Sequence, residues 1–425
     1  MISWILFITY VAFIFIMYQA KCDDTRNSNP LYFTTHELIQ LCDFAENNLK
    51  IYIYPSNKTY CKQTRDYFKL EQKLPEYIRS SKVYTSNPLT ADLFLIPHEL
   101  VCSGMSKYND STYQSIYMNP LWSQFITSPY YQKYQGADHI FIYEGDNGLF
   151  CDTIGGACHI PYKYTKYLQN MIIIGNYGYS PLMNLSSGRV KPPVTRGCFS
   201  LNHDLVVPQY NSFYCEIPRP ELSARDVLTV FWGNLVRGLE CSPGARQALK
   251  HLKKSLSGQS RRIFEFQNRR IGPRMSFMSF CPAGHACWSS RLYDAICSHS
   301  IPIIIARGVI EPFERFFNWQ KFTLKYDTED LYHESFLSSF ITPFFTSNHT
   351  RNRWKIAPHK REEVTAKLVA LKVVAPWFSW QPKLKQNAWR LIILELFCRT
   401  KLGRVSAPCQ QSSSTIALKT YGFND

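Results

Sequence analysis

Short apolar segments recur along this chain, and polar or helix-favouring sequence separates them. The segments are KIYIYP (50–55), ADLFLIP (91–97), ADHIFIY (137–143), LVVP (205–208), LTVFWGN (228–234) and IPIII (301–305). Apolar runs of this length between turn residues are typical of buried strands, and a helical window at 245–256 separates the last two. Strands that alternate with helices form parallel sheets with helices packed on their faces. The sequence therefore predicts an α/β fold.

The strands fall into two series, one before and one after about residue 220. A chain of 425 residues is too long for one hydrophobic core, so two domains are expected. The stretch IPRPE (217–221) is the predicted linker. We assign one Rossmann-like domain to 46–220, a second to 221–345, and a C-terminal extension to 346–425. The last helix of that extension is expected to pack back on the N-terminal domain.

The N-terminus carries an uncharged apolar run from Ile2 to Tyr18, followed by Lys21. This run is at the short limit for a membrane-spanning helix, which needs roughly 17–25 residues. A cleaved signal peptide is the alternative, but the bulky Tyr18 lies where a small residue is expected before a cleavage site. We predict an uncleaved signal anchor at 1–20 and a luminal stem at 21–45. Either interpretation exports the rest of the chain.

Cysteines and glycosylation motifs agree with export. The 14 cysteines are not arranged in the CxxC pairs of zinc sites, so disulfides in an oxidising compartment are expected. Cys151 and Cys158 are spaced to close a small loop. Four N-x-S/T sequons, typical of exported glycoproteins, begin at Asn57, Asn109, Asn184 and Asn348.

The chain is strongly basic. Its 48 Lys and Arg residues exceed 32 Asp and Glu residues, for a net charge of +16. Such a surface attracts anions. Because no zinc-finger or RNP signature is present, nucleic acid is not an expected partner. Phosphorylated donors, acidic glycans and lipid headgroups remain.

The stretch SFCPAGHACWSSRLYDAICSHSIPIII (279–305) places polar residues just ahead of a buried strand. Ser289 or Ser290 can cap a helix that continues through Arg291. Arg291 and Asp294 then lie on one face near the helix N-terminus, whose free N–H groups suit a phosphate. The arginine can bind the same phosphate, and the carboxylate can accept hydrogen bonds from a ribose. The stretch therefore predicts a nucleotide-diphosphate site; the alternative is an Arg–Asp pair on a helix surface.

Several motifs occur in a defined order along the chain. They are KIYIYP, YTSNPLTADLFLIP, GADHIFIYEGDNG, FWGN, SFCPAG, SSRLYDAI, IPIII and EPFERFFNWQKFTL. The ordered set, over about 50–325, resembles the exostosin family of glycosyltransferases (glycosyltransferase family 47). The resemblance implies a GT-B fold, in which two Rossmann-like domains face each other across a cleft. The N-terminal domain would lie on the acceptor side, and the C-terminal domain would bind a nucleotide sugar, usually a UDP-sugar.

The same resemblance implies donor-binding residues. Arg291 matches the family's arginine and would hold the diphosphate, with Ser290 beside it, while Asp294 matches the family's acidic residue and would hold the ribose. Gly284 matches the glycine of the preceding loop, and Arg237 lies where the family commonly places an arginine near the donor. Since a helix dipole and basic side chains neutralise the leaving diphosphate in GT-B enzymes, no metal ion and no cofactor beyond the donor are expected.

The candidate catalytic base lies in the N-terminal domain. Asp146 matches the acidic position of the family's turn after a strand and would deprotonate the attacking hydroxyl; a turn-forming aspartate is the alternative. Glu99 and His98 are reserve candidates at another strand end, with a structural pair as the alternative. The chain departs from the family at His285, usually Asp, and at His299, usually Gly. A left-handed backbone at His299 would cost about 1–2 kcal/mol.

The resemblance implies an inverting glycosyltransferase that moves a sugar from a UDP-sugar to a glycan or glycoprotein acceptor. It would be a single-pass type II Golgi membrane protein with a luminal catalytic part; a location in the secretory-pathway lumen or secretion is the alternative. The alternative function is a catalytically weak exostosin-like pseudoenzyme that binds glycan or supports an active transferase. Arg291 and Asp294 favour the enzyme, whereas His285 and His299 leave room for the pseudoenzyme. Homo- or hetero-oligomers are compatible with both.

Overall fold

The fold is described from a computed structural model of the chain. The described residues are 32–56, 69–98, 119–144, 166–176, 178–179, 204–210, 215, 225, 227–233, 245–255, 264–266, 273–282, 289–306, 309–326, 345–348, 353–356 and 358–402. Two five-stranded sheets, each with parallel pairing throughout, form the framework, as the alternation of strands and helices predicts.

The first sheet, here called the N-terminal sheet, has the strand order β1-β2-β3-β4-β6. Its strands are β1 (Ile51–Ile53), β2 (Leu93–Leu95), β3 (His139–Tyr143), β4 (Ile172–Gly175) and β6 (Leu205–Val206). Tyr84 adds an isolated parallel bridge to Ile51. Ile51 also pairs with Leu93 of β2, so the bridge at Tyr84 lies on one side of β1 and β2 lies on the other. Along the chain, the segment at Tyr84 comes first, and the chain then crosses to the other side of β1 to form β2. This reversal is typical of doubly wound α/β sheets.

The second sheet, here called the C-terminal sheet, has the order β12-β10-β9-β7-β8. Its strands are β7 (Val227–Phe231), β8 (Phe264–Phe266), β9 (Ser276–Pro282), β10 (Ile301–Ile305) and β12 (Leu324–Tyr326). The chain passes from β7 to β8 on one side and then returns to place β9 on the other side of β7. The topological switch point therefore lies between β7 and β9, where ligands of doubly wound sheets bind outside the carboxyl ends of the strands.

The remaining elements are helices and two small antiparallel pairs. The α-helices are α2 (Thr35–Asn48), α3 (Leu70–Arg79), α6 (Asn119–Ile126), α7 (Pro129–Tyr134), α10 (Ala245–Ser255), α11 (Ser290–Cys297), α14 (Arg361–Val374) and α15 (Ala388–Phe397). Single turns are η2 (Pro88–Thr90), η5 (Pro273–Met275), η6 (Trp319–Lys321), η9 (Pro358–Lys360), η10 (Ala375–Phe378) and the π-helical η11 (Cys398–Leu402). The antiparallel pairs join β5 (Gly178–Tyr179) to β11 (Val309–Ile310), and β13 (Phe345–Asn348) to β14 (Arg353–Ile356).

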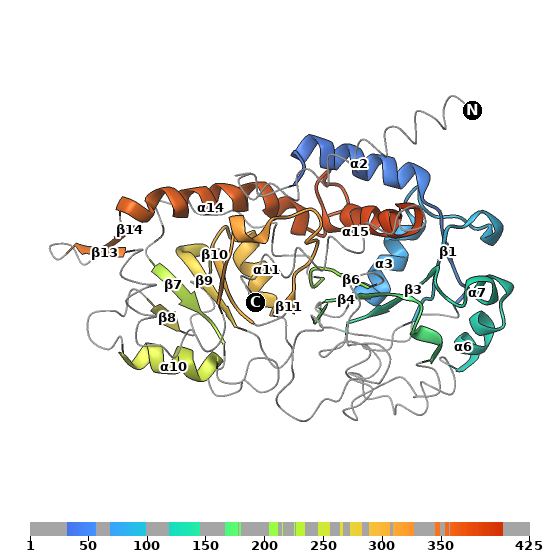
Figure 1. Ribbon diagram of the computed structural model, residues 1–425, viewed down its shortest axis with the longest axis horizontal. Coiled ribbons are helices and arrows are strands. Elements are labelled where there is room, and N and C mark those ends of the chain that lie inside the picture. The colour runs from blue at the N-terminus through green and yellow to red at the C-terminus, as the bar shows by residue number, and fades with distance from the viewer. Residues whose placement is uncertain are drawn as a thin grey trace, which may run out of the picture.

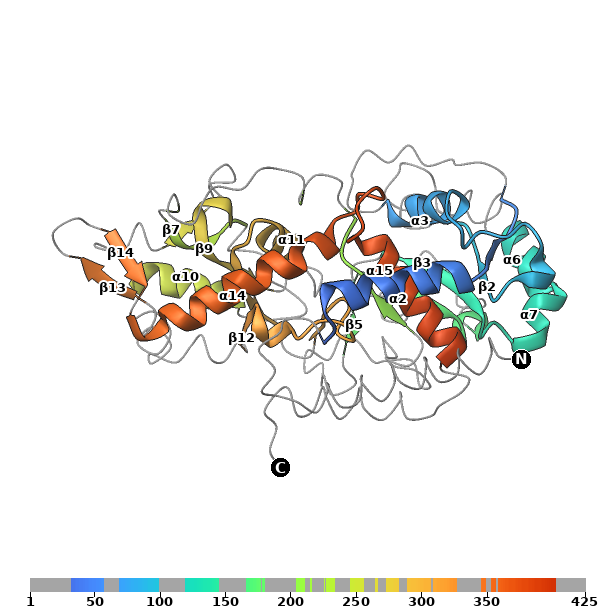
Figure 2. The same cartoon turned by 90° about the horizontal axis from the view of Figure 1, so that it is seen from above.

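The two sheets lie side by side, each with its own helices (Figure 1). Helix α14 runs along the half that holds the C-terminal sheet, while α2 and α15 lie together over the other half (Figure 2). The short β5–β11 pair connects the two halves, since β5 follows β4 in the sequence and β11 follows β10.

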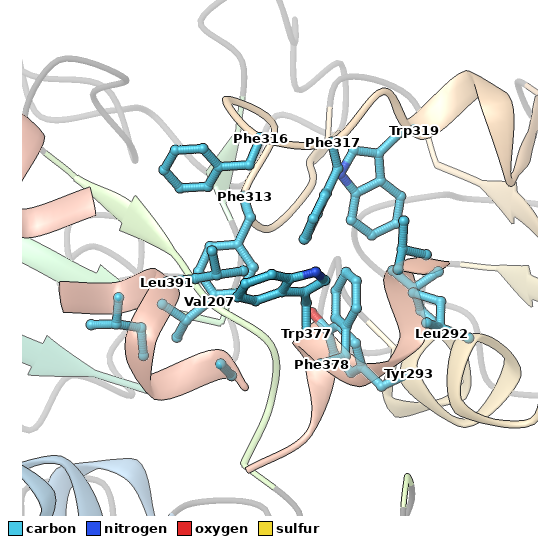
Figure 3. Close-up of a cluster of buried hydrophobic side chains, with 14 of the residues drawn as sticks. Val207, Leu292, Tyr293, Phe313, Phe316, Phe317, Trp319, Trp377, Phe378 and Leu391 are labelled. Carbon is cyan, nitrogen blue, oxygen red and sulfur yellow. The ribbon is translucent and has the colours of Figure 1, made fainter. Parts of the chain in front are cut away.

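One hydrophobic core continues from the first sheet to the second. Val207, which follows β6, and Leu391 of α15 meet Phe313, Trp377 and Tyr293 in it (Figure 3). All five side chains are buried. Burial of aromatic side chains of this size contributes a large share of the stability of a core. The two halves are therefore held by shared packing and not only by the chain that links them.

Helix α2 begins within the segment predicted as a luminal stem, 21–45. Thr34 caps the helix in a capping box with Glu37. Arg390 of α15 pairs with Asp43 and also donates from Nε to Glu46 Oε1 at 2.9 Å. The second part of the predicted stem is thus a helix of the folded core, because its apolar face finds a partner in α15.

Two further sequence predictions concern the membrane and the disulfides. Within the described ranges, no helix is long and apolar enough to cross a bilayer, and the predicted anchor at 1–20 lies outside those ranges. A disulfide joins Cys215 to Cys297 at the end of α11, as an oxidising compartment predicts. The suggested loop between Cys151 and Cys158 also lies outside the described residues.

Candidate functional site

Helix α11 begins at the topological switch point of the C-terminal sheet. Ser289 is the N-cap of this helix, and its hydroxyl accepts from the backbone N–H of Arg291 at 3.4 Å. The helix N-terminus carries free N–H groups and a partial positive charge. Ser290 is the first residue of α11, so the serine cap predicted from the sequence is found at Ser289.

Arg291 is held across the end of β7. Its Nε donates to the carbonyl of Trp232, and its Nη1 donates to Ser289 Oγ at 2.8 Å. The guanidinium lies over the ring of Phe231, with Cζ 5.2 Å from the ring centroid. A cation fixed by two hydrogen bonds and an aromatic face is preorganised, which lowers the entropic cost of binding an anion.

Gly233 gives the arginine the space it needs. Its φ is +157°, and a Cβ at this position would lie 2.9 Å from Arg291 Cζ and closer still to Nη2. Ordinary contacts of a Cβ begin near 3.4 Å. The FWGN segment therefore ends its strand with the one residue type that lets the guanidinium lie against the backbone.

A second arginine, Arg246, lies close to Arg291. It is in the first turn of α10 and is buried. Burial and the positive charge of Arg291 lower the pKa of Arg246 to about 10. The two guanidinium groups are close enough for their positive charges to interact. Together, at the end of a parallel sheet, they strongly attract an anion such as a diphosphate. Arg246 is not among the residues predicted from the sequence, because only the fold brings α10 to this position.

Asp294 lies one turn after Arg291 and is buried, so the alternative of an Arg–Asp pair on a helix surface does not describe it. Cys281, at the carboxyl end of β9, lies within the electrostatic reach of Arg291, Asp294 and Glu311. Burial raises the pKa of this thiol, so it stays neutral. These side chains therefore gather at the switch point.

Glu311 adds a titratable carboxyl to the same region. It follows β11 and is buried, and its Oε1 lies 3.6 Å from Lys325 Nζ. Burial raises the pKa of Glu311 to about 7, although Lys325 opposes the shift. Its charge therefore changes near neutral pH, which was not foreseen from the sequence.

The carboxyl end of the N-terminal sheet carries a separate group of buried polar side chains. His98 follows β2, Glu144 follows β3 and Asn176 follows β4, and Glu71 reaches them from the first turn of α3. Ligands of parallel sheets bind at this edge. This group is thus the described part of the predicted acceptor side.

His98, a reserve candidate for the base, is stacked on Phe141 with ring centroids 4.0 Å apart. Its Nδ1 lies 3.8 Å from Glu71 Oε1. Burial lowers the pKa of His98 to about 3, so its imidazole is neutral at physiological pH. Among the described residues, the acidic neighbour of His98 is therefore Glu71.

The other predicted site residues, Glu99, Asp146, Arg237, Gly284 and His285, lie outside the described residues. Their roles stay predictions.

His299, where the family usually has glycine, has a left-handed conformation with φ +53°, so the strain considered from the sequence applies here. Its carbonyl accepts from Arg225 Nη1 at 2.8 Å. Arg225 also donates to the carbonyls of Ser276 and Ser298, so it ties the start of this half to both ends of the β9–α11 unit. The strained residue is thus held in place by a buried arginine.

Comparison with known proteins identifies the family of the chain. A family model described as the Exostosin GT47 domain matches residues 45–340. A probable glucuronoxylan glucuronosyltransferase of Arabidopsis thaliana is 27% identical over 309 residues, which is 67% of this chain and 62% of that protein. A probable β-1,4-xylosyltransferase of the same plant is 25% identical over 320 residues, covering 70% of this chain and 72% of the relative.

This chain thus spans somewhat less than two thirds of the length of the first relative. A solved structure described as "Crystal Structure of TarM" has a TM-score of 0.28 and 9% identity, over 63% of this chain and 57% of that one, which is too low to carry an argument. The family match covers both sheets and the switch-point site. The chain therefore belongs to the exostosin GT47 family.

Proposed function

We propose that the protein is an inverting glycosyltransferase that transfers a sugar from a UDP-sugar to a glycan or glycoprotein acceptor. The observation that carries this proposal is the site at the switch point of the C-terminal sheet. There, Arg291 is fixed against Phe231 and Trp232 at the N-terminus of α11, with Arg246 beside it. Family membership and the names of the relatives support the same activity.

The chemistry follows from the charge of the leaving group. When the bond between the sugar and the diphosphate breaks, negative charge develops on the diphosphate, and donors positioned in advance stabilise it. In the proposed site, Arg291, Arg246 and the N–H groups of the first turn of α11 supply those donors. Asp294 would accept hydrogen bonds from the ribose. Among the described residues, no group of three or more His, Cys, Asp or Glu side chains could hold a metal ion.

Inversion is a single displacement, so the proposal also needs a base on the acceptor side. Asp146 remains the first candidate, since it follows β3 by three residues and the end of this strand belongs to the acceptor side. Glu99 and His98 stay in reserve. The two parallel doubly wound sheets agree with the GT-B arrangement, in which the donor domain and the acceptor domain are separate Rossmann-like units.

We also place the enzyme in the Golgi, anchored through 1–20. The uncharged run Ile2–Tyr18, the Cys215–Cys297 disulfide and the sequons support passage through the secretory pathway.

UDP release tests the proposal. The purified full chain is incubated with UDP-xylose, UDP-glucuronate, UDP-galactose, UDP-glucose and UDP-N-acetylglucosamine, and UDP is measured with and without glycan acceptors. At least one donor should give UDP, and Arg291→Ala should abolish most of the release. If the chain neither binds UDP nor releases it from any donor, the proposal is wrong. Binding of UDP without release would favour the pseudoenzyme.

A further inference from the structure

Glu144 and Asn176 lie next to each other at the carboxyl end of the N-terminal sheet. In the parallel pairing of β3 with β4, Tyr143 is opposite Gly175, so the residues that follow each strand are also neighbours. Side chains at the same level of two parallel strands point to the same face. The Asn176 side chain is close enough to interact with the Glu144 carboxyl as a weak hydrogen-bond donor, which lowers the pKa of that carboxyl.

Both side chains are buried, with exposed fractions of 0% for Glu144 and 2% for Asn176. Glu144 Oε2 accepts from the backbone N–H of Glu71 at 3.3 Å. Within the described part of the chain, no hydrogen bond of normal geometry reaches Glu144 Oε1 or either amide atom of Asn176. Apart from the contact of Asn176 with Glu144, these three adjacent buried atoms have no partner among the described residues, although more than nine in ten buried polar groups of folded proteins have one.

Such atoms destabilise the fold, because each has lost its contact with water and gained nothing in return. An apolar pair would be more stable at this place. The arrangement makes sense if a ligand supplies the missing partners. An ordered internal water is the other group that could do so.

The charge state of Glu144 indicates which ligand fits. Burial raises the pKa of Glu144 to about 8, opposed by the backbone N–H groups of Glu71 and Leu70 and by Asn176. Among the described residues, Glu71 of α3 donates its backbone N–H to Glu144, and its carboxylate lies 3.8 Å from His98, whose imidazole stays neutral. At neutral pH the pair therefore offers a carboxyl O–H donor, an amide donor and an amide acceptor, all without charge.

We propose that Glu144 and Asn176 form a subsite that hydrogen-bonds a hydroxyl group of a neutral acceptor sugar. A sugar hydroxyl both donates and accepts, so it matches the pair. An anion would meet the carboxyl groups of Glu71 and Glu144, and a cation would find a Glu144 that is protonated. This inference rests on the proposed transferase activity, because it gives the acceptor its place on the N-terminal sheet.

Calorimetry with the full chain tests the subsite. In the presence of saturating UDP, the wild-type chain is titrated with β-1,4-xylohexaose, cellohexaose and mannohexaose. We expect at least one of them to bind, and Asn176→Leu, which keeps roughly the volume of the side chain, to weaken that binding about tenfold through the loss of one to two hydrogen bonds. The midpoint of thermal unfolding should fall little, since the Asn176 side chain interacts in the unliganded fold only with Glu144.

Glu144→Gln distinguishes a neutral hydrogen-bonding group from an ionised base. Glutamine still accepts from Glu71 N and still offers a donor, so sugar binding should stay within about twofold of wild type. Wild-type binding should weaken as the pH rises through about 8, where the carboxyl loses its proton, and Glu144→Gln should bind equally well from pH 6 to pH 9. A Glu144→Gln variant that binds normally but loses its turnover would show a base, and would overturn the subsite.

Tyr54→Phe is the matched control. Tyr54 OH is a buried group of the same sheet that is hydrogen-bonded to His139 Nε2 at 2.9 Å and to Ser128 Oγ at 3.3 Å. Its loss should lower the unfolding midpoint and leave sugar binding unchanged. Equal binding by Asn176→Leu and wild type, as an internal water would give, contradicts the inference, and so does failure of all three hexasaccharides to bind. Loss of UDP binding by the wild-type chain would instead refute the proposed transferase.

Discussion

Replacement of Gly233 by alanine should damage the donor site without removing any donor-binding group. The added Cβ would lie 2.9 Å from Arg291 Cζ, where ordinary contacts begin near 3.4 Å, so the guanidinium has to move by at least about 0.5 Å. That movement breaks the fit of Arg291 to Trp232, Ser289 and Phe231. An alanine at a φ of +157° also strains the backbone, which lowers the free energy of unfolding by about 1–3 kcal/mol.

The expected loss of UDP affinity follows from the hydrogen bond between Arg291 and the diphosphate, which the movement of the guanidinium would weaken. A charge-assisted hydrogen bond contributes roughly 1.5–3 kcal/mol, which is about 10- to 150-fold in the dissociation constant. Because Arg246 stays in place, we expect Gly233→Ala to raise the dissociation constant of UDP by an amount at the lower end of this range. Isothermal titration calorimetry with UDP measures the dissociation constants of wild type, Gly233→Ala, Arg291→Ala and the double variant.

Two features make this prediction sharp. The effects of Gly233→Ala and Arg291→Ala should not add, since the alanine acts only through the arginine. Gly136→Ala is a matched control in the N-terminal half: its φ is +86°, and a Cβ there would lie 2.8 Å from Tyr131 Cε2. This control should lower stability and leave UDP affinity unchanged. A folded Gly233→Ala protein with wild-type affinity, or additive effects in the double variant, would refute the role given to Arg291.

Three further predictions concern stability and are measured by urea unfolding. His299→Gly should raise the free energy of unfolding by about 1 kcal/mol, because it relieves a left-handed residue; a decrease would mean that the imidazole contributes more than the strain costs. Arg225→Met should lower it by about 3 kcal/mol, since two buried carbonyls and one part-buried carbonyl lose their donor, and a loss below about 1 kcal/mol would contradict that reasoning. Cys215→Ser should cost about 4–5 kcal/mol, the loop-closure entropy of a disulfide with a sequence separation of 82, and a loss below about 2 kcal/mol would contradict that reasoning.

Much of the framework is readable from local pattern. The predicted strands become β1, β2, β3, β6, β7 and β10, and the helical window becomes α10. β4 and β9 are not among the predicted strands. The apolar run of β4 is no shorter than that of the predicted strand LVVP and could have been recognised. β9 carries Ser276 and Ser279, whose hydroxyl groups form a buried network with Ser300 that no periodicity reveals.

Helix α2 carried a signal that could have been used. Thr34 and Glu37 have the spacing of a capping box, and Leu38, Cys42 and Ala45 recur at helical spacing. The helix is stable only because α15, from the other end of the chain, covers this face. Whether this segment is an exposed stem or a packed helix depends on a partner more than three hundred residues away in the sequence, as the pairing of Arg390 with Asp43 shows.

Some residues of the candidate donor site could be predicted from the sequence, and others are brought to it only by the fold. Arg291 and Asp294 share one helix, so their spacing was enough to predict that they act together. Arg246 and Gly233 reach Arg291 only through the winding of β7, α10 and β9, and no local motif joins them. Glu144 has the neutral character of its carboxyl because it is buried, which a sequence does not show.

A crystal structure of the full chain with UDP tests the central claim most directly. The diphosphate should lie at the carboxyl end of β7 and β9, with a phosphate oxygen within hydrogen-bonding distance of the Arg291 guanidinium and of the first N–H groups of α11, and Arg246 should face the same group. The ribose should lie toward Asp294. A UDP molecule bound elsewhere, or one at this edge that does not contact Arg291, would contradict the account.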